Sequence, residues 1–188
     1  MKILFAARLE AAKDPITFVK AGLQLPNHEF IIAGDGSLKK QCEILASGRN
    51  NIKFLGWVDA ETVCRLMKEA DVFCQSDNVE NIWSSSLVAA MKNKMAVICT
   101  NTGCTSKYLE DNYHVLLISP QSCSELVSAI EKLSSDNELR YRLGENAQAF
   151  VRDNLSIEKI VKEIQRWIAS TVQDWKDQEK PKEWKQPN

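Results

Sequence analysis

The sequence lacks an apolar run near the 18–20 residues that a membrane-spanning helix needs. It also lacks a charge excess, because 24 Lys and Arg against 25 Asp and Glu leave a formal net charge of −1. No overall field therefore attracts nucleic acid or an anionic membrane. The short apolar N-terminus turns polar at once, unlike a secretory signal. We expect a cytoplasmic chain without a transmembrane segment or a nucleic-acid partner, at most peripheral to a membrane through another protein.

Metal-ligand patterns are missing as well. The two histidines, His28 and His114, lie far apart in the sequence, and none of the 6 cysteines forms a C-x-x-C pair. We therefore predict no metal site. The cysteines are expected to be reduced thiols that fill apolar helix and strand positions.

The 188 residues are 44% hydrophobic and 26% charged, which is typical of a globular domain. Short apolar runs alternate with segments of helical spacing, and several runs are apolar on both faces. This pattern predicts a doubly wound α/β fold, with a mostly parallel six-stranded sheet and helices on both faces. The predicted strands are Lys2–Ala7, Glu29–Ala33, Ile52–Leu55, Asp71–Cys74, Met95–Thr100 and His114–Ser119.

Capping signals locate the helices between the strands. Asp14 and Pro15 begin one that reaches about Leu23, and Ser122 with Glu125 forms a capping box for another. The other predicted helices are about Leu38–Ala46, Asp59–Met67, Leu87–Lys92 and Asp136–Arg152, with a last one from Ser156.

The last predicted helix carries an apolar stripe from Ile157 to Trp175. This stripe either packs on its own domain or contacts another domain or subunit. We expect one domain over residues 1–172 and a fraying polar tail over residues 173–188, which contains Pro181 and Pro187.

In a doubly wound sheet, ligands bind beyond the carboxyl ends of the strands. The first strand leads to Arg8 and Lys13, two cations that either grip a diphosphate or are solvated. The second leads to Gly34 and Gly36, which either let a ligand approach the backbone or form a simple turn. Lys39 takes the place of the third glycine of a dinucleotide fingerprint.

The fourth strand leads into the polar segment of residues 75–86, which is rich in serine. Such a loop ahead of a helix suits hydrogen bonds to sugar hydroxyls and phosphate oxygens. Serines are also ordinary helix caps.

In this order, the segments resemble the C-terminal, donor-binding domain of retaining glycosyltransferases of the GT-B architecture, family four. ILFAARLEAAKD is similar to the family's strand and G-R-L-x-x-x-K-G segment, and IIAGDGSLKKQCE to its I-x-G-x-G loop. IKFLGWVDAETVCRLMKEADVFCQSD is similar to its F-L-G-x-V segment, helix and A-D-V-F strand. SLVAAMKNKMAVICTNTG resembles L-x-E-A-M-A-x-G-x-P-V-I-A-T-x-x-G, and NELRYRLGENAQAFVRDNLSIEKI resembles the closing helices.

The resemblance implies transfer of a sugar from a nucleoside diphosphate sugar to an acceptor hydroxyl, with retention and without a metal or other cofactor. It implies a nucleotide-sugar-binding domain over residues 1–172 and an acceptor site in a separate N-terminal domain or partner chain. Arg8, Lys13 and Glu80 would be the catalytic residues. The implied substrate-binding residues are Gly34, Gly36, Trp57, Val58, Asp59, Asn81, Ile82, Trp83, Ser84 and Gly103.

Several family carboxylates are replaced. The second Glu of the family's E-x7-E pair, which binds ribose, falls at Val88 or at Ala89 depending on the alignment. The family's G-G-x-x-E becomes a segment that begins at Gly103 and ends at Ser106, and E-G-F-G becomes residues 80–83. We therefore expect these losses to weaken donor binding, because a buried hydrogen bond contributes about 0.5–1.5 kcal/mol.

Two other functions compete with sugar transfer. The missing carboxylates favour a binding or interaction module that has kept the fold but lost catalysis. The hypothesis of a nicotinamide-dependent enzyme is based on Gly34 and Gly36 alone. Lys39 and the absence of a ribose-binding acid argue against it.

Overall fold

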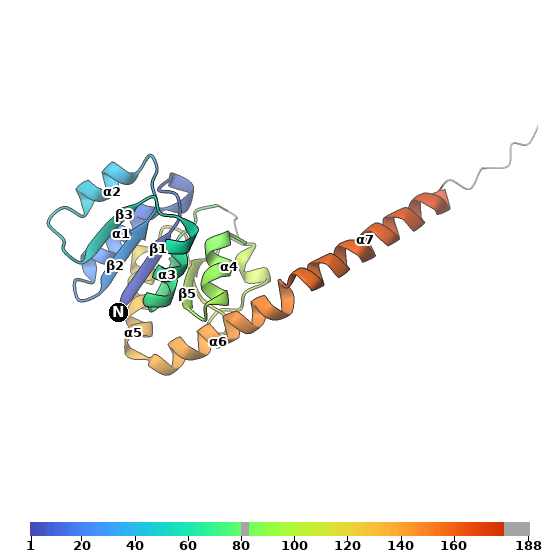
Figure 1. The fold of residues 1–188 in the computed structure, drawn as a ribbon. Helices are drawn as coiled ribbons and strands as arrows, with labels where there is room; N and C mark the ends of the chain where they lie inside the picture. Colours follow the sequence, from blue (N-terminus) through green and yellow to red (C-terminus); the bar gives the residue numbers. More distant parts are fainter. Residues whose placement is uncertain (80–82, 179–188) are drawn as a thin grey trace, which may run out of the picture. The chain divides into compact units, whose positions relative to one another are not determined.

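The structure of the protein is a computed structural model, which describes residues 1–79 and 83–178. Six parallel strands form one sheet in the order β3-β2-β1-β4-β5-β6 (Figure 1). The order reverses between β1 and β4, which is where a doubly wound sheet opens a crevice at its carboxyl edge. The strands are β1 (Lys2–Ala6), β2 (Glu29–Ala33), β3 (Ile52–Gly56), β4 (Val72–Gln75), β5 (Ala96–Thr100) and β6 (Leu116–Ile118).

Helices cover both faces of the sheet. α1 and α5 pack together on one face, and α3 and α4 pack against β1, β4 and β5 on the other. The helices are α1 (Pro15–Gln24), α2 (Lys39–Leu45), α3 (Ala60–Glu69), α4 (Ser85–Lys92), α5 (Cys123–Ser135), α6 (Asn137–Asn154) and α7 (Ile157–Gln178), with 3₁₀ turns η1 (Ala11–Lys13) and η2 (Thr105–Lys107). The doubly wound fold predicted from the sequence is confirmed.

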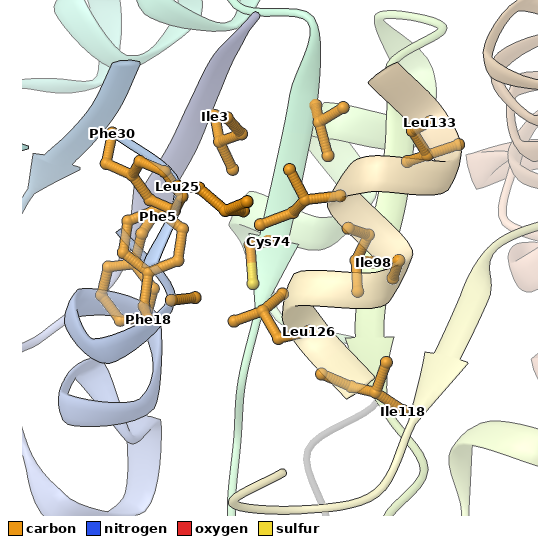
Figure 2. Packing of buried hydrophobic residues seen from close by; sticks show 14 of the residues in the cluster. Ile3, Phe5, Phe18, Leu25, Phe30, Cys74, Ile98, Ile118, Leu126 and Leu133 are labelled. Atoms are coloured by element: carbon orange, nitrogen blue, oxygen red, sulfur yellow. The ribbon is translucent and has the colours of Figure 1, made fainter. Parts of the chain in front are cut away.

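The main core lies between the sheet and the α1/α5 layer (Figure 2). Phe18 of α1 packs between Phe5 of β1 and Phe30 of β2, with ring centroids 5.4 Å and 5.1 Å apart. Leu126 and Leu133 of α5 fill the other end of this layer. These contacts hold β1 rigidly at the centre of the sheet, and so they fix the strand end from which Arg8 emerges.

The predicted capping residues act as caps. The carboxylate of Asp14 accepts a hydrogen bond from the Thr17 amide at 3.2 Å, and Ser122 Oγ accepts one from the Glu125 amide at 3.3 Å. Glu125 Oε2 accepts from the Ser119 amide at 2.7 Å, whereas the Ser122 amide donates to the Ser119 carbonyl, so the capping box is only half formed. All six cysteines are free thiols.

The chain divides into two compact units, Met1–Val151 and Arg152–Asn188. α7 ends at Gln178, and the division into a domain over residues 1–172 and a tail over residues 173–188 stays a prediction. The apolar stripe of α7 is exposed, with 76% of Ile157 and 68% of Trp167 accessible to solvent. No described helix is both long enough and apolar enough to span a membrane.

Candidate functional site

A cleft of about 480 Å³ opens at the carboxyl ends of β1 and β4, where the strand order reverses. The ends of β1 and β4 form its floor. One wall comes from the β3–α3 connection and α3, and the other from the first turns of α4. This is the place where a doubly wound sheet presents loop side chains and helix N-termini to a ligand.

Both predicted cations line the cleft, in different states. Arg8 is exposed, and its guanidinium makes no hydrogen bond or ion pair with any residue that the structure describes. Lys13 Nζ lies 2.8 Å from Asp77 Oδ2, and only 15% of the Lys13 side chain and 3% of the Asp77 side chain remain exposed. The cleft therefore combines one solvent-exposed and one ion-paired positive charge.

The loop after β1 is fastened to the segment after β4. Ser76 Oγ lies within hydrogen-bond distance of the Lys13 and Asp14 carbonyl oxygens, at 3.1 Å and 3.0 Å. The Asn78 amide donates to the Ala12 carbonyl at 2.9 Å. The segment after β4 therefore sets the position of Lys13. The sequence predicted two polar loops but not that they bind each other.

The two glycines after β2 serve the packing of neighbouring loops. A Cβ on Gly34 would overlap the Ala7 carbonyl, and one on Gly36 would come within 2.5 Å of the Leu9 carbonyl oxygen. Gly34 lines the cleft, whereas Gly36 is not among its lining residues. The close backbone approach that glycine permits here is to the loop after β1.

The first turn of α4 faces the cleft through Ser84, Ser85 and Ser86. Ser84 Oγ accepts a hydrogen bond from the Leu87 amide at 3.2 Å and lies 2.7 Å from Gln75 Oε1, to which it donates. This contact joins the α4 N-terminus to β4. A helix N-terminus carries unpaired amide donors and a partial positive charge, so it adds to the attraction of the cleft for an anion.

The connection from β3 to α3 gives the cleft an apolar wall. Trp57, 76% exposed, and Val58 line it, followed by Val63 and Cys64 of α3. Asp59 is not among the lining residues. Its carboxylate caps α3 by accepting from the Thr62 amide at 2.7 Å, and hydrogen bonds from the Thr62 side chain and from this amide lower its pKa.

Two further predicted substrate-binding residues lie away from the cleft lining. The Trp83 ring stacks on Phe150, with centroids 5.8 Å apart, and also contacts Tyr108 at 5.7 Å. Gly103 follows β5, where its amide donates to Asn101 Oδ1 at 3.3 Å. The predicted residues Glu80, Asn81 and Ile82 lie outside the described residues.

The structure also distinguishes the two positions that could match the family's ribose carboxylate. Ala89 lines the cleft, whereas Val88 is not among the lining residues. The wall therefore presents a methyl group at this point. The described carboxylates that line the cleft are Asp77, paired with Lys13, and Asp35, whose Oδ2 lies 2.7 Å from Lys39 Nζ.

The charges around the cleft are largely fixed by local bonds. The Lys39 ammonium and the Gly36 amide lower the pKa of Asp35, and hydrogen bonds from Ser37 lower that of Glu10. Both carboxylates thus remain ionised at neutral pH. Within the described part of the chain, no group of three or more His, Cys, Asp or Glu side chains could hold a metal ion.

Known proteins share both the sequence and the fold of this chain. The model of the family described as glycosyl transferases group 1 matches residues 1–150. An uncharacterised glycosyltransferase of Methanocaldococcus jannaschii is 30% identical over 173 residues, which cover 88% of this chain and 44% of the relative. An α-1,4-N-acetyl-D-galactosaminyltransferase of Campylobacter jejuni is 30% identical over 158 residues, covering 80% and 43%. The chain thus spans less than half the length of these curated relatives.

Solved structures show the same fold at lower identity. The C-terminal domain of a glycosyl transferase group 1 family protein from Francisella tularensis is 23% identical, with a TM-score of 0.74 over 83% of this chain and 86% of that domain. HepE of Anabaena, solved with UDP and glucose, is 21% identical, with a TM-score of 0.81 over 90% of this chain and 48% of HepE. Together with the family match over residues 1–150, this likeness identifies the chain as a member of the group 1 glycosyl transferases, with the fold of a GT-B C-terminal domain.

Proposed function

We propose that this chain binds the nucleoside diphosphate part of a nucleotide sugar and takes part in transfer of the sugar, with retention, to an acceptor hydroxyl. The observation that carries the proposal is the meeting of Arg8, Lys13 and the N-terminus of α4 at one cleft. Three sources of positive potential around one hollow suit a diphosphate. The structure of HepE with UDP and glucose supports the same assignment by likeness of fold.

The chemistry follows from where charge develops. When the bond between the sugar and the phosphate breaks, negative charge builds on the leaving diphosphate. Fixed cations and helix amides stabilise this charge more in the transition state than in the ground state. The proposal assigns this role to Arg8, Lys13 and the first turn of α4, and it requires no metal. The base would lie along Trp57 and Val58, and Glu80 would meet the donor sugar.

Transfer also requires an acceptor site, which we place on a separate N-terminal domain or partner chain. The support is that the chain spans less than half the length of its curated relatives. The exposed apolar stripe of α7 is a suitable surface for such a contact, because large apolar patches on soluble proteins commonly mark interfaces.

A nucleotide-sugar-binding module without transfer activity is the second candidate. Ala89, which lines the cleft at one of the two positions where the resemblance places a ribose-binding carboxylate, favours it. Both candidates predict nucleotide binding. They differ in turnover, so sugar transfer measured in the presence of an acceptor-binding domain separates them.

The first experiment is a nucleotide titration followed by thermal and urea unfolding. A ligand at 100 times its Kd stabilises the folded state by about 2.7 kcal/mol. We expect UDP or GDP to stabilise the wild-type chain and the Arg8→Ala/Lys13→Ala variant to lose this gain. Lys40→Ala is a matched control, because it removes an exposed cation of α2 that is not among the cleft-lining residues. The proposal would be wrong if no nucleotide stabilised the wild-type chain, or if nucleotides stabilised the double variant equally.

A further inference from the structure

The Lys13–Asp77 ion pair differs from the other described ion pairs in its burial. The two side chains are 15% and 3% exposed, whereas those of Lys39 and Asp35, at the same edge of the sheet, are 34% and 48% exposed. Separating a buried ion pair leaves an uncompensated charge in the interior, so a buried carboxylate restricts its partner more strongly than a solvated one does.

Asp77 is itself fixed by the sheet. Thr100 Oγ1, at the end of β5, donates to the Asp77 carbonyl oxygen at 2.6 Å. The neighbouring Ser76 and Asn78 bind the loop that carries Lys13. By contrast, η1, the turn that ends at Lys13, has no buried residue of its own. The direction of the Lys13 ammonium therefore depends on Asp77 rather than on packing within its own loop.

From this arrangement we infer that Asp77 is the positioning residue for Lys13, which it holds ready for the diphosphate group of a nucleotide. This inference rests on the proposed function. An ammonium has three N–H donors, and the bond to Asp77 Oδ2 uses one, leaving two for phosphate oxygens. Because the flexible lysine stem is already ordered, the ligand does not have to order it on binding.

Two physical effects of Asp77 have opposite signs. A carboxylate beside an anionic ligand repels it, so charge alone predicts that removing Asp77 strengthens diphosphate binding. Positioning predicts that removal weakens it. The sign of the change in Kd therefore decides between the two effects.

The experiment compares Asp77→Asn and Asp77→Ala by calorimetric titration with UDP and GDP, and by NMR titration with uridine and guanosine. The amide oxygen of Asn still accepts from Lys13, but more weakly than a carboxylate, whereas Ala accepts nothing. We expect diphosphate binding to weaken about threefold in Asp77→Asn and about tenfold in Asp77→Ala, as fits the loss of a charge-assisted hydrogen bond. Nucleoside binding, which does not involve Lys13, is expected to stay unchanged.

A double-mutant cycle with Lys13→Met tests whether Asp77 acts through Lys13. In the Lys13→Met background, either Asp77 substitution is expected to leave the Kd unchanged. Glu10→Gln is the charge control, since Glu10 precedes Lys13 in the same loop but accepts from Ser37 and is not among the cleft-lining residues. It is expected to bind UDP as well as wild type or more tightly. If Asp77→Ala does not fold, the double-mutant cycle is measured with Asp77→Asn and Lys13→Met alone.

The contrary outcomes are distinct. Unchanged or tighter diphosphate binding in the Asp77 variants overturns the inference while leaving the proposed function intact, provided that Arg8→Ala still weakens it. Equal losses for nucleoside and diphosphate indicate a purely structural role and overturn it too. Failure of the wild-type chain to bind any nucleoside diphosphate overturns both.

Discussion

At the scale of single residues, Gly34 shows how tightly the loops of the cleft pack. A methyl group there would overlap the Ala7 carbonyl, a backbone atom that cannot move without shifting the end of β1. We therefore expect Gly34→Ala to lower the free energy of unfolding by about 2 kcal/mol or more, as overpacked sites do. Urea denaturation measures this loss.

Gly48→Ala is the matched control for that substitution. Its Cβ would meet nothing within 4 Å, and only its φ of +78° opposes a side chain, so its expected cost is about 1 kcal/mol. If Gly34→Ala folds with wild-type stability and loses only nucleotide binding, the glycine serves the ligand and not the packing of the loops.

At the scale of elements, α6 packs on the turn that follows α4. A Cβ on Gly144 of α6 would overlap the carbonyl of Lys94, while Lys94 Nζ lies 2.7 Å from Glu145 Oε1. Helix propensity alone predicts that Gly144→Ala stabilises α6 by about 1 kcal/mol. The structure predicts the opposite sign, a loss of about 1–3 kcal/mol in urea denaturation.

Arg142→Ala, at an exposed position of the same helix, is expected to change stability by less than about 0.5 kcal/mol. A gain in stability for Gly144→Ala would show that α6 does not pack on this turn as closely as the structure has it.

The elements themselves could be predicted from the sequence, and the contacts between their loops could not. Apolar runs identified all six strands, and the caps at Asp14 and Ser122 marked helix starts, because these signals are local. The pairing of Lys13 with Asp77 depends on β4 lying beside β1, which no local pattern encodes. The aromatic contacts of Trp83 with Tyr108 and Phe150 likewise join segments distant in the sequence.

At the scale of the whole molecule, the two histidines make the free energy of unfolding depend on pH. Burial lowers the pKa of both side chains below 6.5, and at His28 the positive charge of the nearby N-terminal amino group lowers it further. The unfolded chain therefore takes up protons at a higher pH than the folded chain does. By linkage, the stability due to neutral His28 and His114 is present above pH 6.5 and is lost as the pH falls toward the folded-state pKa values.

We expect the free energy of unfolding to fall between pH 7.5 and pH 5.5, and to fall less in the His28→Gln/His114→Gln variant. Asp14 acts in the opposite direction, since burial raises its pKa and acid favours its folded form. The comparison of the two chains cancels this contribution. Urea denaturation at both pH values measures the difference, and equal slopes in the two chains would contradict the assignment.

The strand order also constrains the order in which the sheet can form during synthesis. β1 gains its first neighbour, β2, soon after it emerges, but its second neighbour, β4, only after β3 and α3 have been made. Until then a nascent chain exposes one edge of its central strand, a known liability for aggregation. Lys13 likewise has no anchor before Asp77 is translated, so the cleft cannot hold this ammonium in place until the segment after β4 has been made.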